Sequence, residues 1–345
     1  MIGTVPAVRL TDVAGRAGVS LATASRVLNG SHRSPAEDIA VRVRAAADEL
    51  GYVANAQAQA LARSATGLIG LVVHDISDPY FSSIVRGAQH AARNQRSQVL
   101  LASTDRHEQT EVDAVKAFAV YRTDAIILAG SRGSHSDEAL TPALQHYTAN
   151  GGRLVTFGHT GFADARVVEV ANADGAARLL TALVERGRRR FVILAGPREL
   201  VTAQQRVAGF RRALADVGLE PVAVQHGEFT SHGGYVSALT HLDAADARAG
   251  GPAEPVCLLA VNDVMALGAL TAVRTRGLRV PDDVEVAGFD DIPTLRDFNP
   301  PLTTFRLPLE RMGTRAAELA LAAEDVGPVL IEGEVVLRES AGGGR

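Results

Sequence analysis

Residues 10–29 read LTDVAGRAGVSLATASRVLN, which is a pattern of two short helices joined by a tight turn. Each half places small or apolar side chains on one face at helical spacing. Gly18 lies between the halves and can adopt the positive φ that a sharp turn requires, and Ser20 stands where an N-cap residue belongs. The stretch therefore predicts a helix–turn–helix near the start of the chain. The residues expected to pack between its helices are Val13, Ala14, Ala17, Ala24, Val27 and Leu28.

A third helix is expected directly after this pair. A capping-box pattern begins at Ser34, with Pro35 at the first helical position, and apolar residues then recur at helical spacing until Gly51. The three helices predict a small all-α domain over residues 1–54. Residues 1–66 hold seven arginines and five acidic residues, a net charge near +2 in a chain whose total is −4. This end of the chain therefore favours a polyanion as partner.

The outward side of the second helix has the composition of a surface that reads DNA. Leu21, Ala22, Ser25 and Arg26 lie on or beside the face that a major groove would meet. An ordinary helical hairpin with solvated charges fits the same pattern. The third helix and the local positive charge favour the DNA interpretation.

After Gly67 the sequence changes to alternating strand-like and helix-like segments. Repeated units of this kind predict parallel sheets with helices on both faces. Two runs of units, before and after about residue 170, predict two doubly wound lobes with a ligand cleft beyond the carboxyl ends of the strands. The strand-like runs are LIGLVV (68–73), SQVLLAS (97–103), DAIILAG (124–130), GRLVTFG (152–158), RFVILAG (190–196), PVAVQHG (221–227), PVCLLAV (255–261) and DVEVAGF (283–289).

Composition excludes several classes of protein. The sequence has no run of eighteen apolar residues and no N-terminal signal sequence, so we expect a cytoplasmic protein. Cys257 is the only cysteine and lies in an apolar run, which predicts a buried structural thiol. The ten histidines show no metal-ligand spacing, and the sequence contains neither a P-loop nor GxGxxG. We therefore expect no metal and no cofactor.

Six motifs, in one order, resemble the lactose-repressor (LacI/GalR) family of bacterial transcriptional regulators. The resemblance runs through nearly the whole chain and is densest at its start. The motifs are DVAGRAGVSLATASRVLN (12–29), ELGYVANAQAQALARSATGLIGL (49–71), LAGPRELVTAQQRVAGFRRAL (194–214), LLAVNDVMALGAL (258–270), VAGFDDIP (286–293) and PPLTTFR (300–306).

The resemblance implies a hinge helix over residues 55–66 and an effector-binding and dimerisation core over residues 67–340, like a periplasmic binding protein. In the family the chain crosses three times between the lobes of this core. A helix over 308–324 would then return to the first lobe, and a strand over 330–337 would lie in the second. The implied lobes are about 67–170 with 308–324, and about 171–304 with 330–340.

The hinge segment from Asn55 to Ser64, NAQAQALARS, favours a helix by propensity but is too short to stand alone in water. The resemblance implies that two such helices pair across a dimer and enter the minor groove. Leu61 matches the leucine that wedges between base pairs and bends the duplex, and Ala58 matches the small residue at the helix contact. A flexible linker with an incidental leucine fits the residues alone.

For base recognition, the resemblance assigns the main choice of sequence to the positions of Leu21 and Ala22, neither of which can hydrogen-bond to a base edge. The strong direct contact should therefore come from Arg26, which can bind a guanine with two hydrogen bonds. Arg9 replaces the usual threonine cap of the first helix, and arginine cannot accept an N–H. The residues expected to contact phosphate are Ser20, Thr23, Ser25 and Asn29.

The matching positions in the cleft combine aromatic rings with charged and amide groups, which suits a hydroxyl-rich ring such as a sugar. They are Asp78, Tyr80, Phe81, Thr202, Gln204, Arg206, Phe229, Asn262 and Asp290. Gly158 and His159 replace an acidic residue that is common in the family, and we expect His159 to donate to the ligand instead. A nucleobase or a phosphorylated sugar also fits. The alternative interpretation makes Phe81 a core residue and Asp290 a loop cap.

These observations predict a homodimeric repressor that binds a nearly palindromic DNA operator and responds to a small effector, most simply a sugar, between its lobes. A two-lobed sugar-binding receptor would share the core, but it would need a signal peptide and would lack residues 1–66. A sugar-processing enzyme would need more than paired acids such as Asp290 and Asp291, because no base, nucleophile and oxyanion set accompanies them. We therefore expect a protein without enzymatic activity.

Overall fold

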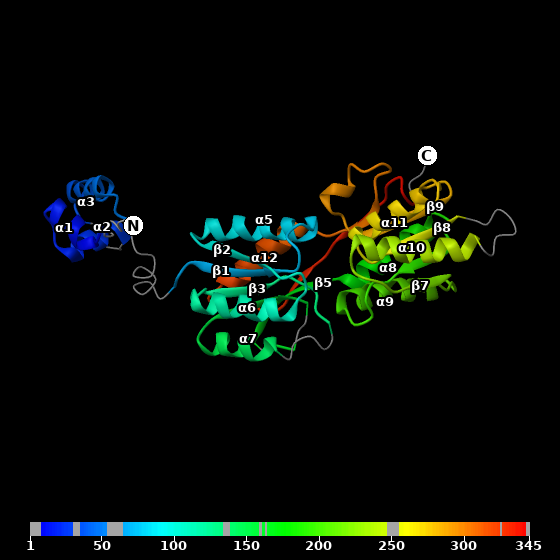
Figure 1. Ribbon diagram of the computed structural model, residues 1–345, viewed down its shortest axis with the longest axis horizontal. Coiled ribbons are helices and arrows are strands. Elements are labelled where there is room, and N and C mark those ends of the chain that lie inside the picture. Colours follow the sequence, from blue (N-terminus) through cyan, green and yellow to red (C-terminus); the bar gives the residue numbers. More distant parts are fainter. Residues whose placement is uncertain are drawn as a thin grey trace, which may run out of the picture. The chain divides into compact units, whose positions relative to one another are not determined.

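The structure of the protein is a computed structural model. It describes residues 8–29, 35–53, 65–133, 139–158, 161–162, 164–246, 255–324 and 326–342. The chain divides into two compact units, Met1–Gly67 and Leu68–Arg345 (Figure 1).

The first unit is a three-helix domain. Its helices are α1 (Leu10–Ala17), α2 (Leu21–Asn29) and α3 (Glu37–Leu50). Val13, Ala24 and Val43, one from each helix, are completely buried, and the other residues expected between α1 and α2 pack in the same cluster. Gly18 has φ 66° and Gly51 has φ 64°, so both helix ends use the left-handed conformation that glycine adopts readily. The predicted helix–turn–helix and third helix are confirmed.

The starts of these helices differ in part from the expectation. The carboxylate of Asp12 accepts the backbone N–H of Arg9 at 2.8 Å, which is the half of a capping box that does not need an acceptor at Arg9. Ser20 caps α2 as predicted, because its Oγ accepts the N–H of Thr23 at 3.2 Å. Pro35 precedes α3 by two residues instead of opening it, and Ser34 lies outside the described residues.

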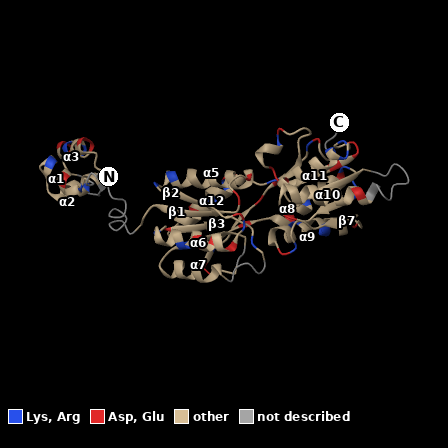
Figure 2. Cartoon of the chain, in the orientation of Figure 1, with Lys and Arg blue, Asp and Glu red and all other residues tan. Residues whose placement is uncertain are grey.

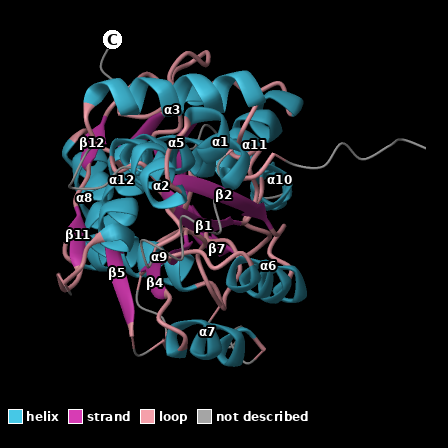
Figure 3. Cartoon of the chain, turned by 90° about the vertical axis from the view of Figure 1, so that its left-hand side faces the viewer, coloured by secondary structure: helices cyan, strands magenta, loops and turns pink. Residues whose placement is uncertain are grey.

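The second unit contains two six-stranded sheets, each with helices on both faces (Figure 3). The first sheet has the strand order β11-β5-β4-β3-β1-β2 and is parallel in every pairing. Helices α5 and α12 pack together over one face, and α6 and α7 cover the other. The bounds are β1 Leu68–Val73, α5 Pro79–Asn94, β2 Gln98–Ser103, α6 Glu108–Val120, β3 Ala125–Leu128, α7 Leu140–Ala149, β4 Arg153–Phe157, β5 Ala165–Val170, α12 Leu309–Leu321 and β11 Val329–Ile331.

The second sheet has the order β12-β10-β9-β8-β6-β7, and only β12 is antiparallel to its neighbour. Helices α8 and α9 pack together on one face, and α10 and α11 on the other. All eight strand-like runs of the sequence form strands. The bounds are α8 Asn172–Glu185, β6 Phe191–Leu194, α9 Val201–Ala215, β7 Ala223–Gln225, α10 Ser231–Asp246, β8 Val256–Ala260, α11 Asp263–Thr275, β9 Val284–Asp290, the short 3₁₀ helix η1 Pro293–Leu295, β10 Thr303–Arg306 and β12 Glu334–Val336.

The end of the chain belongs to both sheets. In Figure 1 the orange α12 lies among the cyan and green elements of the first sheet, and Gly87 and Gly313 allow α5 and α12 to touch backbone to backbone. The sequence predicted a single strand over 330–337 in the second lobe, and this was wrong for its first part. β11 pairs with β5 in the first sheet, and β12 pairs with β10 in the second. The break falls at Gly333, where a side chain would collide with the carbonyl oxygen of Arg306.

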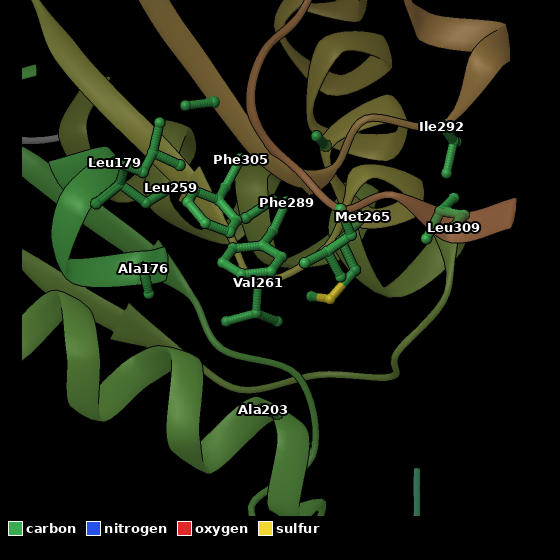
Figure 4. Close-up of a cluster of buried hydrophobic side chains, with 14 of the residues drawn as sticks. Ala176, Leu179, Ala203, Leu259, Val261, Met265, Phe289, Ile292, Phe305 and Leu309 are labelled. Carbon is green, nitrogen blue, oxygen red and sulfur yellow. The ribbon is translucent and has the colours of Figure 1, made fainter. Parts of the chain in front are cut away.

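The largest apolar cluster fills the second lobe and continues into the first. Figure 4 shows part of it, in which the rings of Phe289 and Phe305 lie beside Val261 and Met265; the two ring centroids are 4.9 Å apart. Cys257 is completely buried and burial raises the pKa of its thiol well above the usual range. This agrees with the predicted structural role of Cys257.

Candidate functional site

The outward face of α2 carries most of the residues expected at DNA. Ser20, Leu21, Ala22 and Arg26 are exposed, and Leu21 keeps 49% of its surface although it is apolar. Thr23 is half-buried, and its hydroxyl lies 2.9 Å from that of Ser20. Helix α2 therefore exposes both an apolar side chain, Leu21, and a charged one, Arg26.

Several expected site residues cannot be placed. Ala58, Leu61 and His159 lie outside the described residues. Asn29 is the last residue of α2, and its side chain lies outside the described part of the structure. The hinge segment and the proposed donor at His159 therefore stay predictions.

A cavity lies between the two lobes of the second unit, at the carboxyl ends of the strands. The first lobe supplies Tyr80 of α5, residues shortly after β3 and residues at the ends of β4 and β5, and the second lobe supplies the start of α8 and one side of α9. Eight of its thirteen lining residues carry a polar or charged side chain. The lining residues are Tyr80, Ala129, Ser131, Arg132, Phe157, Gly158, Glu169, Val170, Asn172, Val201, Thr202, Gln205 and Arg206.

Arg206 is the most firmly held of these side chains and is only 2% exposed. Its Nε donates to Oδ1 of Asn172 at 2.9 Å, and its Nη1 donates to the carbonyl oxygen of Val261 at 2.7 Å. Its Nη2 lies 3.0 Å from Oδ1 of Asp290, and its guanidinium stacks 3.9 Å from the ring centroid of Phe289. Such packing fixes the direction of the guanidinium at the cavity wall.

Asp290 ends β9 in a strained conformation, with φ 124°, and Asp291 follows with φ 57°. Burial raises the pKa of Asp290 to about 8, and the nearby charge of Arg206 only partly opposes this. The contact with Arg206 is close, but Oδ1 of Asp290 makes no well-directed hydrogen bond among the described residues. Asp290 therefore holds a proton that a better-paired carboxylate would release.

Asp290 and Asp291 are adjacent in sequence, but their carboxyl groups contact different neighbours. The structure therefore gives no support for a catalytic pair formed by these two acids. Asp291 is 1% exposed and lies 3.2 Å from Arg296, 2.6 Å from Arg306 and 2.7 Å from Arg338. It joins the ends of β9 and β10 to the chain after β12. Asp291 is therefore an ion-pair centre of the second lobe and not a partner of Asp290.

At the start of α5 the structure brings Tyr80, but not Phe81, to the cavity. Asp78 is the N-cap, and its Oδ1 accepts the N–H of Tyr80 at 2.9 Å. Phe81 is 4% exposed and packs edge-on against Tyr80 and His74, with ring centroids 5.0 and 5.6 Å apart. Phe81 thus lies behind the wall and supports it, as the alternative interpretation of this residue described.

On α9, Thr202 and Gln205 line the cavity whereas Gln204 does not. The Nε2 of Gln204 donates to the carbonyl oxygen of Arg198 at 2.6 Å, away from the cavity. One residue along a helix turns the side chain by about 100°, so of these two neighbouring glutamines it is Gln205 that faces the cavity. Thr202 also joins the lobes, because its hydroxyl lies 2.7 Å from that of Ser131.

Phe229 and Asn262 are not among the residues that line the cavity. The Phe229 ring packs on Gly196, and the Arg106 guanidinium of the first lobe lies 5.4 Å from its centroid. Asn262 is 4% exposed and is the N-cap of α11, since its Oδ1 accepts the N–H of Met265 at 2.8 Å.

Sequence reasoning missed Ser131, Arg132, Asn172 and Gln205. Ser131 and Arg132 lie three and four residues after the end of β3, and Asn172 follows β5 by two residues. The rule that ligands bind at carboxyl ends of parallel strands could have selected these three.

The comparisons with known proteins agree along the chain. Residues 9–55 match the family described as "Bacterial regulatory proteins, lacI family", and residues 180–341 match the "Periplasmic binding protein-like domain". The HTH-type transcriptional regulator GalR of Escherichia coli is 32% identical over 322 residues, which cover 93% of this chain and 90% of GalR. The chain belongs to the LacI family.

Other LacI-family relatives support the same assignment. The HTH-type transcriptional regulator reg1 of Streptomyces lividans is 36% identical, over 92% of this chain and 90% of that protein. The lac repressor dimer bound to operator and the anti-inducer ONPF has a TM-score of 0.82 at 26% identity, over 97% of this chain and 99% of that one. The complex of the regulator CelR with cellobiose has a TM-score of 0.69 at 28% identity, over 97% and 100%. The protein is thus a LacI-family transcriptional regulator, and these relatives are named as regulators, not as enzymes.

The described residues contain neither a candidate membrane span nor a candidate metal site. No helix among them combines the length and apolar character of a membrane span. No group of three or more histidine, cysteine or acidic side chains in the same part of the chain is arranged to hold a metal ion.

Proposed function

We propose that the protein is a repressor that acts as a homodimer on a nearly palindromic operator and whose affinity for DNA is set by a small hydroxylated effector, most simply a sugar, bound between the lobes. The observation that carries this proposal is the buried Arg206 network on the wall of an interlobe cavity, in a chain that also has a helix–turn–helix unit. The CelR complex with cellobiose and the operator-bound lac repressor dimer support it as relatives.

The proposed coupling is a change in lobe arrangement on effector binding. Residues of both lobes line the cavity, so a ligand that touches both favours one arrangement of the lobes over another. In a dimer this changes the spacing of the two DNA-binding units. Coupling free energies of about 1–3 kcal/mol are typical of such systems, and the operator must then change effector affinity by the same factor.

The proposed DNA contacts divide into readout and positioning. Arg26 would bind a guanine with two hydrogen bonds, Leu21 and Ala22 would contact thymine methyl groups, and Leu61 would open a base step in the minor groove. Ser20, Thr23, Ser25 and Asn29 would bind phosphate, with Ala58 at the contact between hinge helices.

The test begins with DNA ligands selected from a random pool by the full-length protein, followed by a thermal-shift screen against sugars, sugar phosphates, polyols and nucleosides. Any ligand found is added to gel-shift titrations of the selected DNA. We expect Arg26→Ala to lose about 1–3 kcal/mol of sequence discrimination, while Arg42→Ala, an exposed arginine of α3, keeps the selected preference. Leu61→Ala should reduce DNA bending with the dimer intact.

The outcomes separate the parts of the proposal. A bound sugar that leaves DNA affinity unchanged would refute the coupling. Equal DNA preference in Arg26→Ala and wild type would remove Arg26 from base readout. Ligand binding with turnover of that ligand would refute a purely regulatory role.

A further inference from the structure

A second cavity lies within the first lobe, at the edge of its sheet where β4 and β5 begin. Its volume is about 550 Å³, and sites for small molecules measure about 300–1,000 Å³. The second half of α7 and the residues at the starts of β4 and β5 line it. Its polar lining side chains are Gln145, Thr148, Arg153, Asp164 and Arg166. We refer to it as the first-lobe cavity.

The first-lobe cavity is separate from the cavity between the lobes. Arg153 is the first residue of β4, and Arg166 is the second residue of β5. The last residues of the same two strands, Phe157 and Val170, line the interlobe cavity. Figure 3 views the first lobe from the amino ends of its strands, with α7 beside β4. Because the two cavities share no lining residue, a ligand of the first-lobe cavity does not compete for the effector site.

Arg166 is fixed by the end of a neighbouring helix. Its Nη1 donates to the carbonyl oxygens of Leu319 and Ala322, at 2.5 and 2.8 Å. These carbonyls lie at the carboxyl end of α12, where the helix itself supplies no donors. In the part of the chain that the structure describes, no acidic side chain is paired with Arg166. Arg166 therefore brings a positive charge without a carboxylate partner to the cavity wall.

Arg153 has no partner that would explain its position. The residue is half-buried, and its Nε is a buried donor without a hydrogen-bond acceptor among the described residues. No ion pair of its guanidinium occurs among them either. A buried donor without an acceptor is unfavourable. An acceptor that enters the cavity therefore stabilises Arg153, whereas the folded chain alone leaves it unsatisfied.

The backbone before Arg153 is held firmly, so the side chain starts from a fixed point. A side chain at Gly152 would collide with the ring of Tyr147 on α7, and this close approach sets the position of the β4 start against α7. The hydroxyl of Tyr147 in turn donates to the carbonyl oxygen of Thr123 at 2.7 Å. The floor of the first-lobe cavity is thus part of the packed lobe.

The charges and donors of the first-lobe cavity indicate the ligand that it suits. Two arginines and one acid, the exposed Asp164, give its lining a net charge of +1. Arginine binds phosphate and carboxylate groups with paired hydrogen bonds. A phosphate group has three acceptor oxygens and up to two negative charges, so it can serve two guanidinium groups at once. Asp164 offers acceptor oxygens that suit hydroxyl groups on the rest of the ligand.

We propose that the first-lobe cavity is a second ligand site, which binds a small polyol phosphate. Arg153 and Arg166 donate hydrogen bonds to its phosphate oxygens, and Asp164 accepts hydrogen bonds from its hydroxyl groups. The site is independent of the proposed effector site, so either can fail without the other.

The experiment compares three probes that divide such a ligand into its parts. Full-length protein is titrated by isothermal calorimetry with glycerol 3-phosphate, inorganic phosphate and glycerol, at low ionic strength because salt screens these charges. We expect glycerol 3-phosphate to bind more tightly than phosphate, and glycerol to show no binding. The unfolding temperature of every variant is recorded without ligand, so that loss of folding is recognised.

Three variants of the first-lobe cavity test the assigned roles. Arg153→Gln should bind glycerol 3-phosphate about tenfold more weakly without a lower unfolding temperature, because Arg153 makes no hydrogen bond or ion pair among the described residues. Arg153→Lys keeps the charge but not the paired hydrogen bonds, so we expect an intermediate affinity. Asp164→Asn should bind inorganic phosphate more tightly, because it removes a like charge from the wall, an effect that a merely structural residue would not produce.

Three further variants locate the bound phosphate. Arg93→Gln is the matched control, since Arg93 is an exposed arginine of α5 in the same lobe and does not line the cavity. Arg26→Gln tests the DNA-binding unit, and Arg206→Gln tests the interlobe cavity. All three should bind glycerol 3-phosphate as wild type does.

The outcomes support or overturn the proposal as follows. A selective loss of glycerol 3-phosphate binding in Arg153→Gln, with the three location variants unchanged, supports it. Equal binding by Arg153→Gln and wild type, or a loss in Arg26→Gln or Arg206→Gln in its place, would put the phosphate elsewhere and overturn it. Glycerol binding as tight as that of glycerol 3-phosphate would overturn the anionic assignment. No heat of binding from either phosphate compound with folded wild type would refute the site.

Discussion

The two lobes hold an arginine at the same cavity in different ways. Glu111 in the first lobe accepts two hydrogen bonds from Arg132 and lies near His74, and these contacts lower its pKa although burial acts to raise it. Asp290 in the second lobe is equally hidden but has one poorly directed contact with Arg206, and burial raises its pKa to about 8. The number and direction of contacts, and not burial alone, decide whether a buried carboxyl is ionised.

The same difference appears in the arginines. Arg132 donates two hydrogen bonds to the ionised Glu111, whereas Arg206 divides its donors between Asn172, the carbonyl oxygen of Val261 and Asp290. The first-lobe pair is therefore an ion pair, and the second-lobe arginine is a member of a mostly neutral hydrogen-bond network. Figure 2 shows basic and acidic residues interspersed over elements of both lobes, so the overall charge of a lobe does not explain the contrast.

The largest expected effect is the loss of Arg132. Arg132→Ala should lower the free energy of unfolding by about 3–5 kcal/mol at pH 7, because it leaves the ionised Glu111 buried without its partner. Arg206→Ala should cost less, about 1–3 kcal/mol, because it leaves neutral acceptors and a protonated Asp290. Urea unfolding of both variants at pH 7 measures the two losses. Equal losses would show that the two pairs are ionised alike.

The pH dependence of stability should have opposite signs in the two lobes. Folding raises the pKa of Asp290, so its stabilising contribution is complete below about pH 4 and declines as the pH rises toward 8. Folding lowers the pKa of Glu111, so its contribution is present at neutral pH and is lost as the pH falls below 4.5. The measurement is urea unfolding between pH 4 and 8.

The free energy of unfolding of wild type minus that of Asp290→Asn should fall as the pH rises from 4 to 8, by up to about 1.4 kcal/mol per pH unit. The corresponding difference for Glu111→Gln should stay level from pH 6 to 8. A level difference for Asp290→Asn would mean that Asp290 is ionised in the folded protein.

The two glutamines of α9 offer a narrower test of the second lobe. Gln205→Ala should weaken the binding of any effector by about 1 kcal/mol, because Gln205 lines the cavity and its Oε1 accepts a hydrogen bond from Asn172. Gln204→Ala removes only a contact with the Arg198 carbonyl and should leave effector affinity unchanged. Calorimetric titration of both variants compares adjacent residues of one helix.

The smallest expected effect concerns the contact that joins the lobes. Ser131→Ala removes one side of the 2.7 Å hydrogen bond to Thr202 and should cost about 0.5–1.5 kcal/mol of stability. A double-mutant cycle with Thr202→Val isolates the energy of this pair. A coupling energy of zero would mean that the two hydroxyls contribute to the cavity independently.

The sequence predicted the elements better than the side-chain network. The helix–turn–helix follows from the spacing of Val13, Ala24 and their neighbours, and the strands follow from apolar runs, because both signals are local and periodic. The pairing of Arg132 with Glu111 joins residues 21 positions apart on different elements, and no local pattern encodes it. The choice between Gln204 and Gln205 depended on the rotation of α9 about its axis, and the motif alone did not give that rotation.

Backbone geometry accounts for the other differences. The positive φ of Asp290 and Asp291 sends adjacent carboxyls to different partners, although the sequence shows only two acids in a row. The split of one expected strand into β11 and β12 required knowledge of which sheet each half would join. Such features depend on tertiary structure, and propensity has little influence on them.

The return of α12 and β11 to the first lobe has a consequence for synthesis of the chain. The last described helix of the first unit, α3, is complete once Leu50 has left the ribosome. The first lobe is complete much later, because α12, which covers part of one face of its sheet, ends at Leu321, and its edge strand β11 ends at Ile331. At about 5–20 residues per second, some 15–50 seconds separate these events. A nascent chain would therefore present the three described helices of its DNA-binding unit well before the two lobes are complete.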